Sequence, residues 1–184
     1  MFVRNATHEL VGVSLALAAA KVVQADPLET VGLAAASLCG SRLPDVDQLG
    51  ARVHRRSRLE RRSLLVGAIG AALRLPLRAF AALVPHRGVT HSAVACATAA
   101  GVAALVAAPA GAATALAVGA GIGIGYAAHL AADACTPGGV RLWAPLSGQR
   151  VWLLPPRARI PTGSLREAAL ATMVVAVLAV VLIS

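Results

Sequence analysis

Histidine and aspartate side chains that could bind a metal ion occur in four parts of the sequence. Asp45 and Asp47 lie one residue apart, so both carboxylates can reach one cation or bridge two. His129 and Asp133 are four residues apart, and this spacing places both side chains on one face of a helix. Imidazole and carboxylate together suit zinc, manganese or iron. The candidate ligands are His8, Asp45, Asp47, His86, His91, His129 and Asp133.

Each of these patterns also has an ordinary structural explanation. Pro44 followed by Asp45 is typical of a turn, and a helical His–Asp pair can simply cap a helix or sit in a core. His86 and His91 are too far apart for one helical face, although a turn at Gly88 could bring one of them back. The metal hypothesis therefore depends on where the rest of the chain places these residues.

The composition predicts that membrane helices position them. Hydrophobic residues make up 58% of the 184 residues and charged residues 14%, with a mean hydropathy of +0.74. Soluble domains are usually near half apolar and a quarter charged. Most of the apolar content is Ala, Val and Leu, and aromatic residues are only 3%, which is typical of closely packed helices in lipid. This composition excludes a disordered chain and disfavours a water-soluble one.

The apolar segments predict an all-α, polytopic helix bundle that forms a single integral membrane domain over residues 1–184. A membrane span needs about 20 residues, and several of these segments are shorter, so thinning of the bilayer or snorkelling ends would be needed. The second segment is the weakest, because it is short and has Glu29 and Arg42 at its ends. The expected spans lie near 10–25, 28–43, 92–108, 110–135 and 168–183.

Residues 64–84 form an apolar segment of a different kind. Arg74, Pro76 and Arg78 lie in its middle. A charge at the bilayer centre costs several kcal/mol, on the order of 3 or more, and proline removes a helix hydrogen bond. We therefore expect an in-plane or re-entrant amphipathic segment rather than a sixth span.

The net charge of +9 is one-sided in this arrangement. Every arginine falls on the face that carries the N-terminus and the basic loops 44–62 and 136–166, whereas the opposite face has only Lys21. The positive-inside rule places the arginine-rich face and the N-terminus in the cytoplasm, so the sequence predicts a multi-pass protein of the cell's inner (plasma) membrane. All the candidate ligands lie on the same face, which favours a metal site.

The basic run 52–62 has two interpretations. Nucleic-acid binding would need interleaved aromatic residues or a recognisable module, and the run has neither. A juxtamembrane basic cluster instead interacts with anionic lipid. We therefore expect membrane lipids, and a possible cytoplasmic protein, as partners, with no direct contact to nucleic acid; the oligomeric state is left open.

Two further patterns bear on the first and fourth spans. Arg4, the apolar run to Ala20 and the small residues near Ala25 also fit a cleaved signal peptide, although His8 and Glu9 interrupt its basic region. In the fourth span, glycines spaced four residues apart predict close helix packing just before His129. They are Gly119, Gly121, Gly123 and Gly125.

Three motifs in this order resemble the YdjM-like family, whose members are described as inner-membrane-associated, metal-dependent hydrolases with a LexA-binding prototype. They are LPDVD (43–47), HRGVTHS (86–92) and GYAAHLAADACTPGGVRLWAP (125–145), and His8 precedes them. The resemblance covers roughly residues 7–161 and implies a membrane location, a metal and hydrolysis, without naming a substrate. Gln48 follows Asp47 where members of the family often have His, so the loop is not expected to supply an imidazole.

The leading hypothesis is a metal-dependent hydrolase at the cytoplasmic membrane surface, with zinc or manganese as the cofactor. His91, His129 and Asp133 would bind the metal, joined by Asp45, Asp47 or His8. Asp47 or Asp45 would act as general base, and Arg87 would bind an anionic oxygen of a phosphate-containing or lipid ester. Two alternatives remain, a non-enzymatic scaffold with a structural metal site and a metal or proton transporter.

Overall fold

The chain is helical, as the sequence predicts. The computed structural model describes residues 3–47, 62–83 and 88–183. Within these ranges the only β-pairing is an isolated antiparallel bridge between Val140 and Val151. The long helices are α1 (Val3–Val22), α2 (Pro27–Gly40), α4 (Leu64–Leu83), α5 (Ala93–Ala107), α6 (Ala112–Ala134) and α7 (Leu165–Ile183). Short 3-10 helices are η1 (Pro44–Asp47), η3 (Val89–His91), η4 (Ala108–Ala110) and η5 (Pro156–Ala158).

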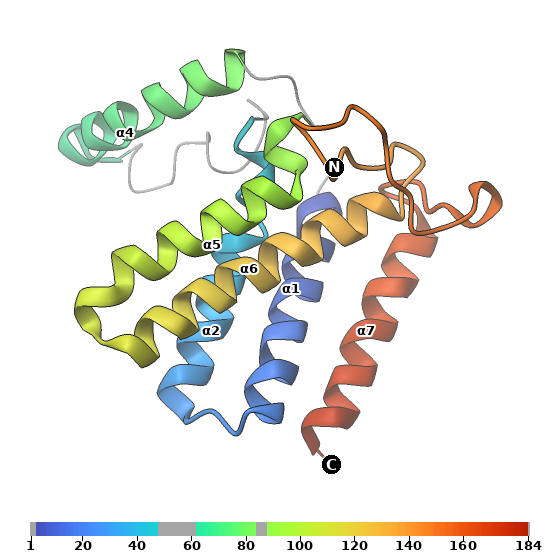
Figure 1. The fold of residues 1–184 in the computed structure, drawn as a ribbon, viewed down its shortest axis with the longest axis horizontal. Helices are drawn as coiled ribbons and strands as arrows, with labels where there is room; N and C mark the ends of the chain where they lie inside the picture. Colours follow the sequence, from blue (N-terminus) through green and yellow to red (C-terminus); the bar gives the residue numbers. More distant parts are fainter. Residues whose placement is uncertain (1–2, 48–61, 84–87, 184) are drawn as a thin grey trace.

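Five of the long helices, α1, α2, α5, α6 and α7, alternate in direction (Figure 1). The turns between α1 and α2 and between α5 and α6 lie at one end of the bundle, together with the C-terminus. The start of α1, η1, η3 and the irregular segment 135–164 lie at the other end, which we call the N-terminal end. Helix α6 is central, since it contacts α1, α2 and α5, whereas α7 contacts α1.

Local sequence signals define where two of these helices begin. Asp26 caps α2: its carboxylate accepts a hydrogen bond from the Glu29 amide at 2.8 Å, and Pro27 occupies the first turn. Ser92 caps α5 in the same manner, accepting from the Ala95 amide at 3.1 Å. The Ser92 cap sets where η3 ends and α5 begins, and it therefore fixes the position of His91.

Helices α2 and α6 pack backbone against backbone. A Cβ atom added to Gly125 would lie 1.9 Å from the Ser37 carbonyl oxygen, and one added to Gly40 would lie 2.3 Å from the Ile122 carbonyl oxygen. At Gly121 it would lie 2.6 Å from the Leu33 carbonyl oxygen. Real Cβ contacts are never this short, so only glycine permits the approach. The predicted close packing of the α6 glycines is confirmed: Gly121 and Gly125 face α2, whereas Gly119 and Gly123 face α5.

Two of the described helices are long and apolar enough to cross a membrane, against the five spans that the sequence predicts. They are the 18-residue stretch Ala93–Ala110, which includes α5 and η4, and the 23 residues of α6. Helix α2 has only 14 residues, and α1 begins in polar sequence at Val3 rather than near residue 10. The two qualifying helices form the α5–α6 hairpin.

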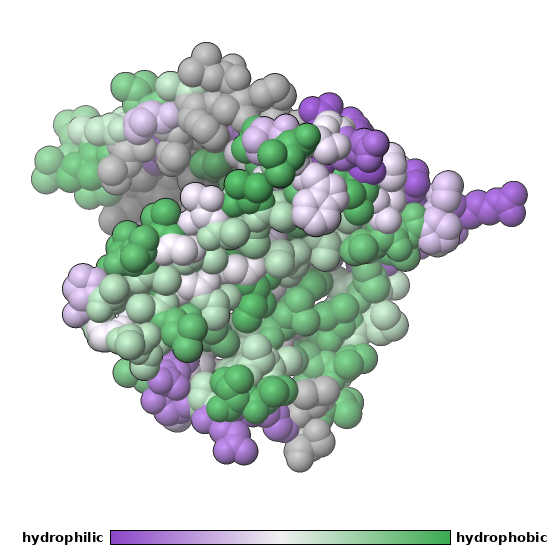
Figure 2. Space-filling model, viewed as in Figure 1, coloured by the Kyte–Doolittle hydropathy of each residue, from purple (hydrophilic) through white to green (hydrophobic). Residues whose placement is uncertain are grey.

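Apolar side chains cover much of the surface (Figure 2). Helix α5 has no buried residue at all, although its sequence is almost entirely apolar. Leu105 and Val106 on α5 are 74% and 77% exposed, and Leu116 on α6 is 73% exposed. Hydrophilic residues gather instead over the segment 135–164 and near the α1–α2 turn. Contiguous exposed apolar surface of this kind marks a membrane or protein contact.

Helix α4 lies apart from the other long helices, at the N-terminal end (Figure 1). It contacts η1, and Pro76 lies inside it. Arg74 is buried, whereas Leu64, Leu65 and Leu75 are 70% exposed or more. The structure therefore places this segment outside the α1–α2–α5–α6–α7 bundle; that it lies in the membrane plane stays a prediction.

Replacing Gly125 by alanine tests the α2–α6 contact. We expect Gly125→Ala to lower the melting temperature of the detergent-solubilised protein, because the new methyl group would force α2 and α6 apart at a cost of about 1–3 kcal/mol or more. Gly101→Ala is the control, since a Cβ there meets nothing within 4 Å and alanine favours a helix. Circular dichroism during heating measures both; equal melting temperatures would contradict the packing argument.

Candidate metal centre

Six of the predicted ligands come together at the N-terminal end of the bundle. His8 lies in the second turn of α1, Asp45 and Asp47 lie in η1, His91 ends η3, and His129 and Asp133 lie near the end of α6. Five of them are buried, with residue exposures from 0% for His91 to 8% for His8. Asp45 is half-buried, with 17% of its side chain exposed. We call these six residues the His/Asp cluster.

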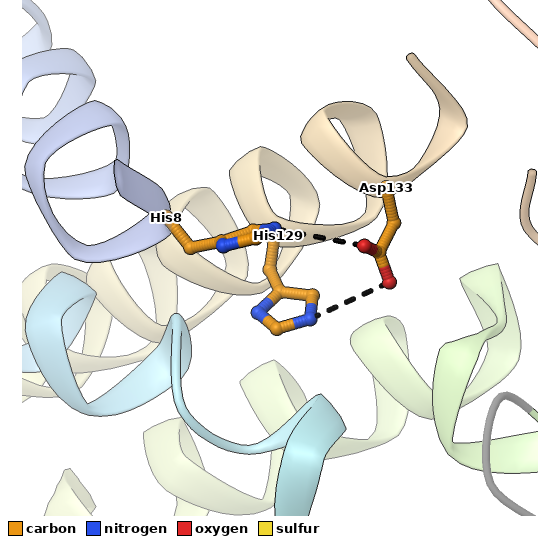
Figure 3. Close-up of side chains that lie close together, drawn as sticks. All are labelled: His8, His129 and Asp133. Atoms are coloured by element: carbon orange, nitrogen blue, oxygen red, sulfur yellow. Dashed lines mark ion pairs between the residues drawn. The ribbon is translucent and has the colours of Figure 1, made fainter. Parts of the chain in front are cut away.

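The first part of the cluster joins α1 to α6 (Figure 3). His8 Nε2 lies 3.6 Å from Asp133 Oδ1, and His129 Nε2 lies 3.7 Å from Asp133 Oδ2. The His8 and His129 rings are stacked at a tilt, with centroids 4.3 Å apart. The spacing of four residues in the sequence thus places His129 and Asp133 on one face of α6, as predicted.

The second part joins η1 and η3 to α6. His91 Nε2 lies 3.4 Å from Asp133 Oδ2. Asp45 Oδ1 lies 3.9 Å from His91 Nε2 and 3.7 Å from His129 Nε2. Two ligands of a tetrahedral zinc ion, each about 2.0–2.1 Å from the metal, are about 3.4 Å apart. Asp45 Oδ1 and Asp133 Oδ2 are thus each at most slightly farther from His91 Nε2 and His129 Nε2 than two ligands of one ion are from each other.

A backbone carbonyl orients His129. Its Nδ1 lies 2.7 Å from the Ser41 carbonyl oxygen. Because a carbonyl only accepts, Nδ1 carries the proton and donates, and the lone pair of the neutral ring is on Nε2. Histidines that bind metals usually donate their other ring nitrogen in this way. His129 is therefore held with the lone pair of Nε2 toward the cluster.

A polar relay orients His91. The Thr90 hydroxyl donates to Asp47 Oδ2, so it can only accept from His91 Nδ1, which lies 3.2 Å away. Asp47 Oδ2 is itself 3.7 Å from His91 Nδ1. The Tyr126 hydroxyl donates to the Thr90 carbonyl, tying η3 to α6. His91 thus presents Nε2 to the cluster, and Asp47 lies behind the ring, on the side away from Asp133.

An ion pair beside the cluster holds α1 against the end of α2. Arg42 Nε donates to Glu9 Oε1 at 3.0 Å. Glu9 follows His8, and Arg42 follows Ser41, whose carbonyl accepts from His129. The hydrogen bond to Glu9 raises the pKa of the Arg42 guanidinium above its usual value. The partners of this ion pair are thus the sequence neighbours of His8 and Ser41, and the pair helps to hold both in place.

Sequence reasoning found the cluster but missed its supports. His86 and Arg87, also predicted for the site, lie outside the described residues. Two signals could have pointed to these supports: Thr90 is the sequence neighbour of His91, and Tyr126 is the only tyrosine of the chain. No sequence signal points to the Ser41 carbonyl, since any residue at that position has one.

Metal analysis tests whether the cluster holds an ion. We expect detergent-purified protein to retain zinc or manganese through dialysis. Asp133→Asn and His129→Ala should lose most of the metal, because both residues belong to both parts of the cluster. Asp26→Asn is the control: it makes the same change at the opposite end of the bundle, and asparagine still caps a helix. Equal metal contents in all four proteins would contradict the metal site.

Comparison with known proteins identifies the family of the chain. No curated protein and no solved structure matches the chain significantly. A family model described as YdjM inner membrane protein matches residues 3–184, which include every residue of the His/Asp cluster. The match confirms the resemblance carried by the three sequence motifs. The chain therefore belongs to the YdjM inner membrane protein family.

Proposed function

We propose that the protein is a multi-pass membrane hydrolase that uses a divalent metal ion at the cytoplasmic surface of the inner membrane, on a phosphate-containing or lipid ester. The observation that carries the proposal is the His/Asp cluster, in which the Nε2 atoms of three histidines and two carboxylates face one another at one end of a bundle rich in apolar surface. The substrate class follows from this location and from the surrounding arginines.

The donor set fits a zinc or manganese ion. Asp45, His91, His129 and Asp133 would hold it, and neutral imidazole with carboxylate is the combination that both metals accept. The two relays behind His91 and His129 are the supports that metal-binding histidines commonly have. When bound, such an ion supplies Lewis acidity to a scissile carbonyl or phosphoryl group.

Asp45 is the member of the cluster best placed to accept a proton from water. Its side chain is 17% exposed, whereas the side chain of Asp47 is fully buried and lies behind His91. Asp45 therefore has access to solvent and substrate that Asp47 lacks. In this proposal Oδ1 of Asp45, which faces the histidines, binds the ion, the other oxygen of the same carboxylate accepts the proton as general base, and Asp47 orients His91. The role of Arg87 in binding an anionic oxygen stays a prediction.

The depth of the cluster favours hydrolysis over transport. A transport path needs ionisable groups near the middle of a span. His8 instead lies in the second turn of α1, and Asp133 is the penultimate residue of α6. The partial exposure of Asp45 likewise favours a reactive site over a closed structural one, because a catalytic metal keeps one position for water or substrate.

The proposed topology puts this end of the bundle in the cytoplasm. The described arginines lie in the first turn of α1, between the end of α2 and the end of α4, or between the end of α6 and the first turn of α7, all at the N-terminal end (Figure 1). Lys21 lies near the α1–α2 turn at the opposite end. Arginine-rich ends of membrane bundles stay in the cytoplasm. Five crossings by α1, α2, α5, α6 and α7 then carry the C-terminus to the outer side.

Reporter fusions test this topology. We expect alkaline phosphatase fused after the last residue to be active, because that enzyme folds only outside the cytoplasm, and green fluorescent protein at the same point to be dark. Insertion of either reporter at Gly148, which is exposed in the segment 135–164, should give the reverse pattern. Identical patterns at the two positions would exclude an odd number of crossings between them.

An ester panel tests hydrolysis. We expect metal-loaded protein in mixed micelles to release product from at least one of phosphatidic acid, a lipid pyrophosphate, a water-soluble phosphate monoester or a carboxyl ester. A chelator should abolish turnover and added metal should restore it. Compared at equal metal content, Asp45→Asn should lower kcat by about 10²-fold or more, as removal of a general base does, and Asp26→Asn should leave it unchanged. If the fully loaded wild type turns over no member of the panel, the metal has a structural role and the protein is a scaffold.

A further inference from the structure

The His/Asp cluster contains more donors than one tetrahedral ion takes. The potential ligands form two overlapping groups, His8 with His129 and Asp133, and Asp45 with His91 and His129. Within each group the ligand atoms all lie within 4.8 Å of one another. A tetrahedral ion takes four ligands, and Asp45, His91, His129 and one oxygen of Asp133 already supply them. His8 is left over, although it faces the cluster.

Asp133 connects the two groups through different oxygens. Its Oδ2 lies 3.4 Å from His91 Nε2 and 3.7 Å from His129 Nε2, whereas its Oδ1 lies 3.6 Å from His8 Nε2. A carboxylate that turns one oxygen to each of two sets of nitrogens has the arrangement of a ligand shared by two ions. In two-metal sites the ions are about 3.5–4 Å apart, a distance that one carboxylate spans.

We propose that the cluster holds two divalent ions that share the Asp133 carboxylate. Asp45, His91, His129 and Asp133 Oδ2 make the first position, and His8 and Asp133 Oδ1 make the second. The proposal rests on the metal-dependent function proposed above and deepens it. A second ion would suit a substrate with a phosphate group, because two ions can hold the attacking and leaving oxygens of one displacement.

The two positions differ in their protein ligands and therefore in affinity. The first is enclosed: His91 is fully buried and His129 is 2% exposed. The second has fewer protein ligands, and His8 is the most exposed of the three histidines, at 8%. The second position thus leaves coordination sites for water or substrate, and we expect it to bind its ion more weakly than the first.

Metal titration tests this assignment on the full-length protein in detergent. After equilibrium dialysis against increasing Mn²⁺, we expect elemental analysis to approach about two ions per chain in the wild type, in two phases, and about one in His8→Gln. Glutamine keeps much of the size and polarity of histidine, so it preserves the packing on His129. Leu10→Ala, an exposed position two residues further along α1, is the matched control and should retain both ions.

Electron paramagnetic resonance adds a readout that does not depend on stoichiometry. Two Mn²⁺ ions that share Asp133 should give an exchange-coupled spectrum, which His8→Gln should convert to the spectrum of an isolated ion. A saturated wild type with about one ion and an uncoupled spectrum would overturn the proposal. So would a His8→Gln protein with the same metal content and the same spectrum as the wild type.

These outcomes are separable from those of the hydrolase test. One ion per chain with normal turnover would refute the shared site and leave the proposed function standing. Two coupled ions without turnover of any ester would do the opposite. Loss of both ions together in His8→Gln would also refute the assignment, because the first position does not contain His8.

Discussion

The backbone contact between α2 and α6 is the constraint on which the rest of the site depends. Gly125 meets the Ser37 carbonyl with no room for a side chain, and one turn further along both helices His129 meets the Ser41 carbonyl at 2.7 Å. Four residues further along each chain segment, the packing contact is thus followed by a hydrogen bond. Because α2 then ends, the chain after Ser41 turns directly into η1 and brings Asp45 to the cluster. If the helices were separated by even the width of a methyl group, the contact between Gly125 and Ser37 would be lost, and with it the contacts that follow from it.

The electrostatics of the cluster favours a bound cation. One oxygen of Asp45 and one of Asp133 lie 3.9 and 3.4 Å from His91 Nε2, so these two oxygens are no more than about 7 Å apart. At an effective dielectric constant near 20, two like charges at about 7 Å repel by roughly 2 kcal/mol, in addition to the cost of their burial. The histidines offer lone pairs rather than protons toward this space, because Nδ1 donates in both His91 and His129. A divalent ion removes the repulsion and uses the lone pairs at the same time.

The residues of the cluster could be predicted from the sequence because the order of the apolar segments and the polar residues at their ends can be read from it. Apolar segments and one-sided arginines assigned His8, Asp45, His91 and His129 to the same face before any contact was known, and the helix repeat paired His129 with Asp133. Contacts between elements were not readable. Nothing in the sequence shows that Gly121 and Gly125 face α2 or that the Ser41 carbonyl accepts a hydrogen bond from His129. Nor does it show that Asp47 lies behind His91 rather than beside it. These contacts depend on how the elements are aligned along one another, and many sequences with the same hydrophobic pattern could have a different alignment. The five predicted spans are not confirmed: among the described helices only Ala93–Ala110 and α6 are long and apolar enough to cross a membrane, and α2 has only 14 residues.

The cluster joins two parts of the structure that are held by different forces. His8, His129 and Asp133 stand on α1 and α6, whose positions follow from apolar and backbone packing against α2. Asp45, Asp47 and His91 stand on η1 and η3, short turns that contact each other and depend on polar links such as those of Thr90 with Asp47 and Tyr126. Helices packed in this way form a rigid frame, whereas a 3-10 turn of three or four residues has little packing of its own. An ion held jointly by His129 and Asp133 of the frame and by Asp45 and His91 of the turns would therefore fix the turns to the frame, so that metal binding and the final ordering of this end of the bundle become one event.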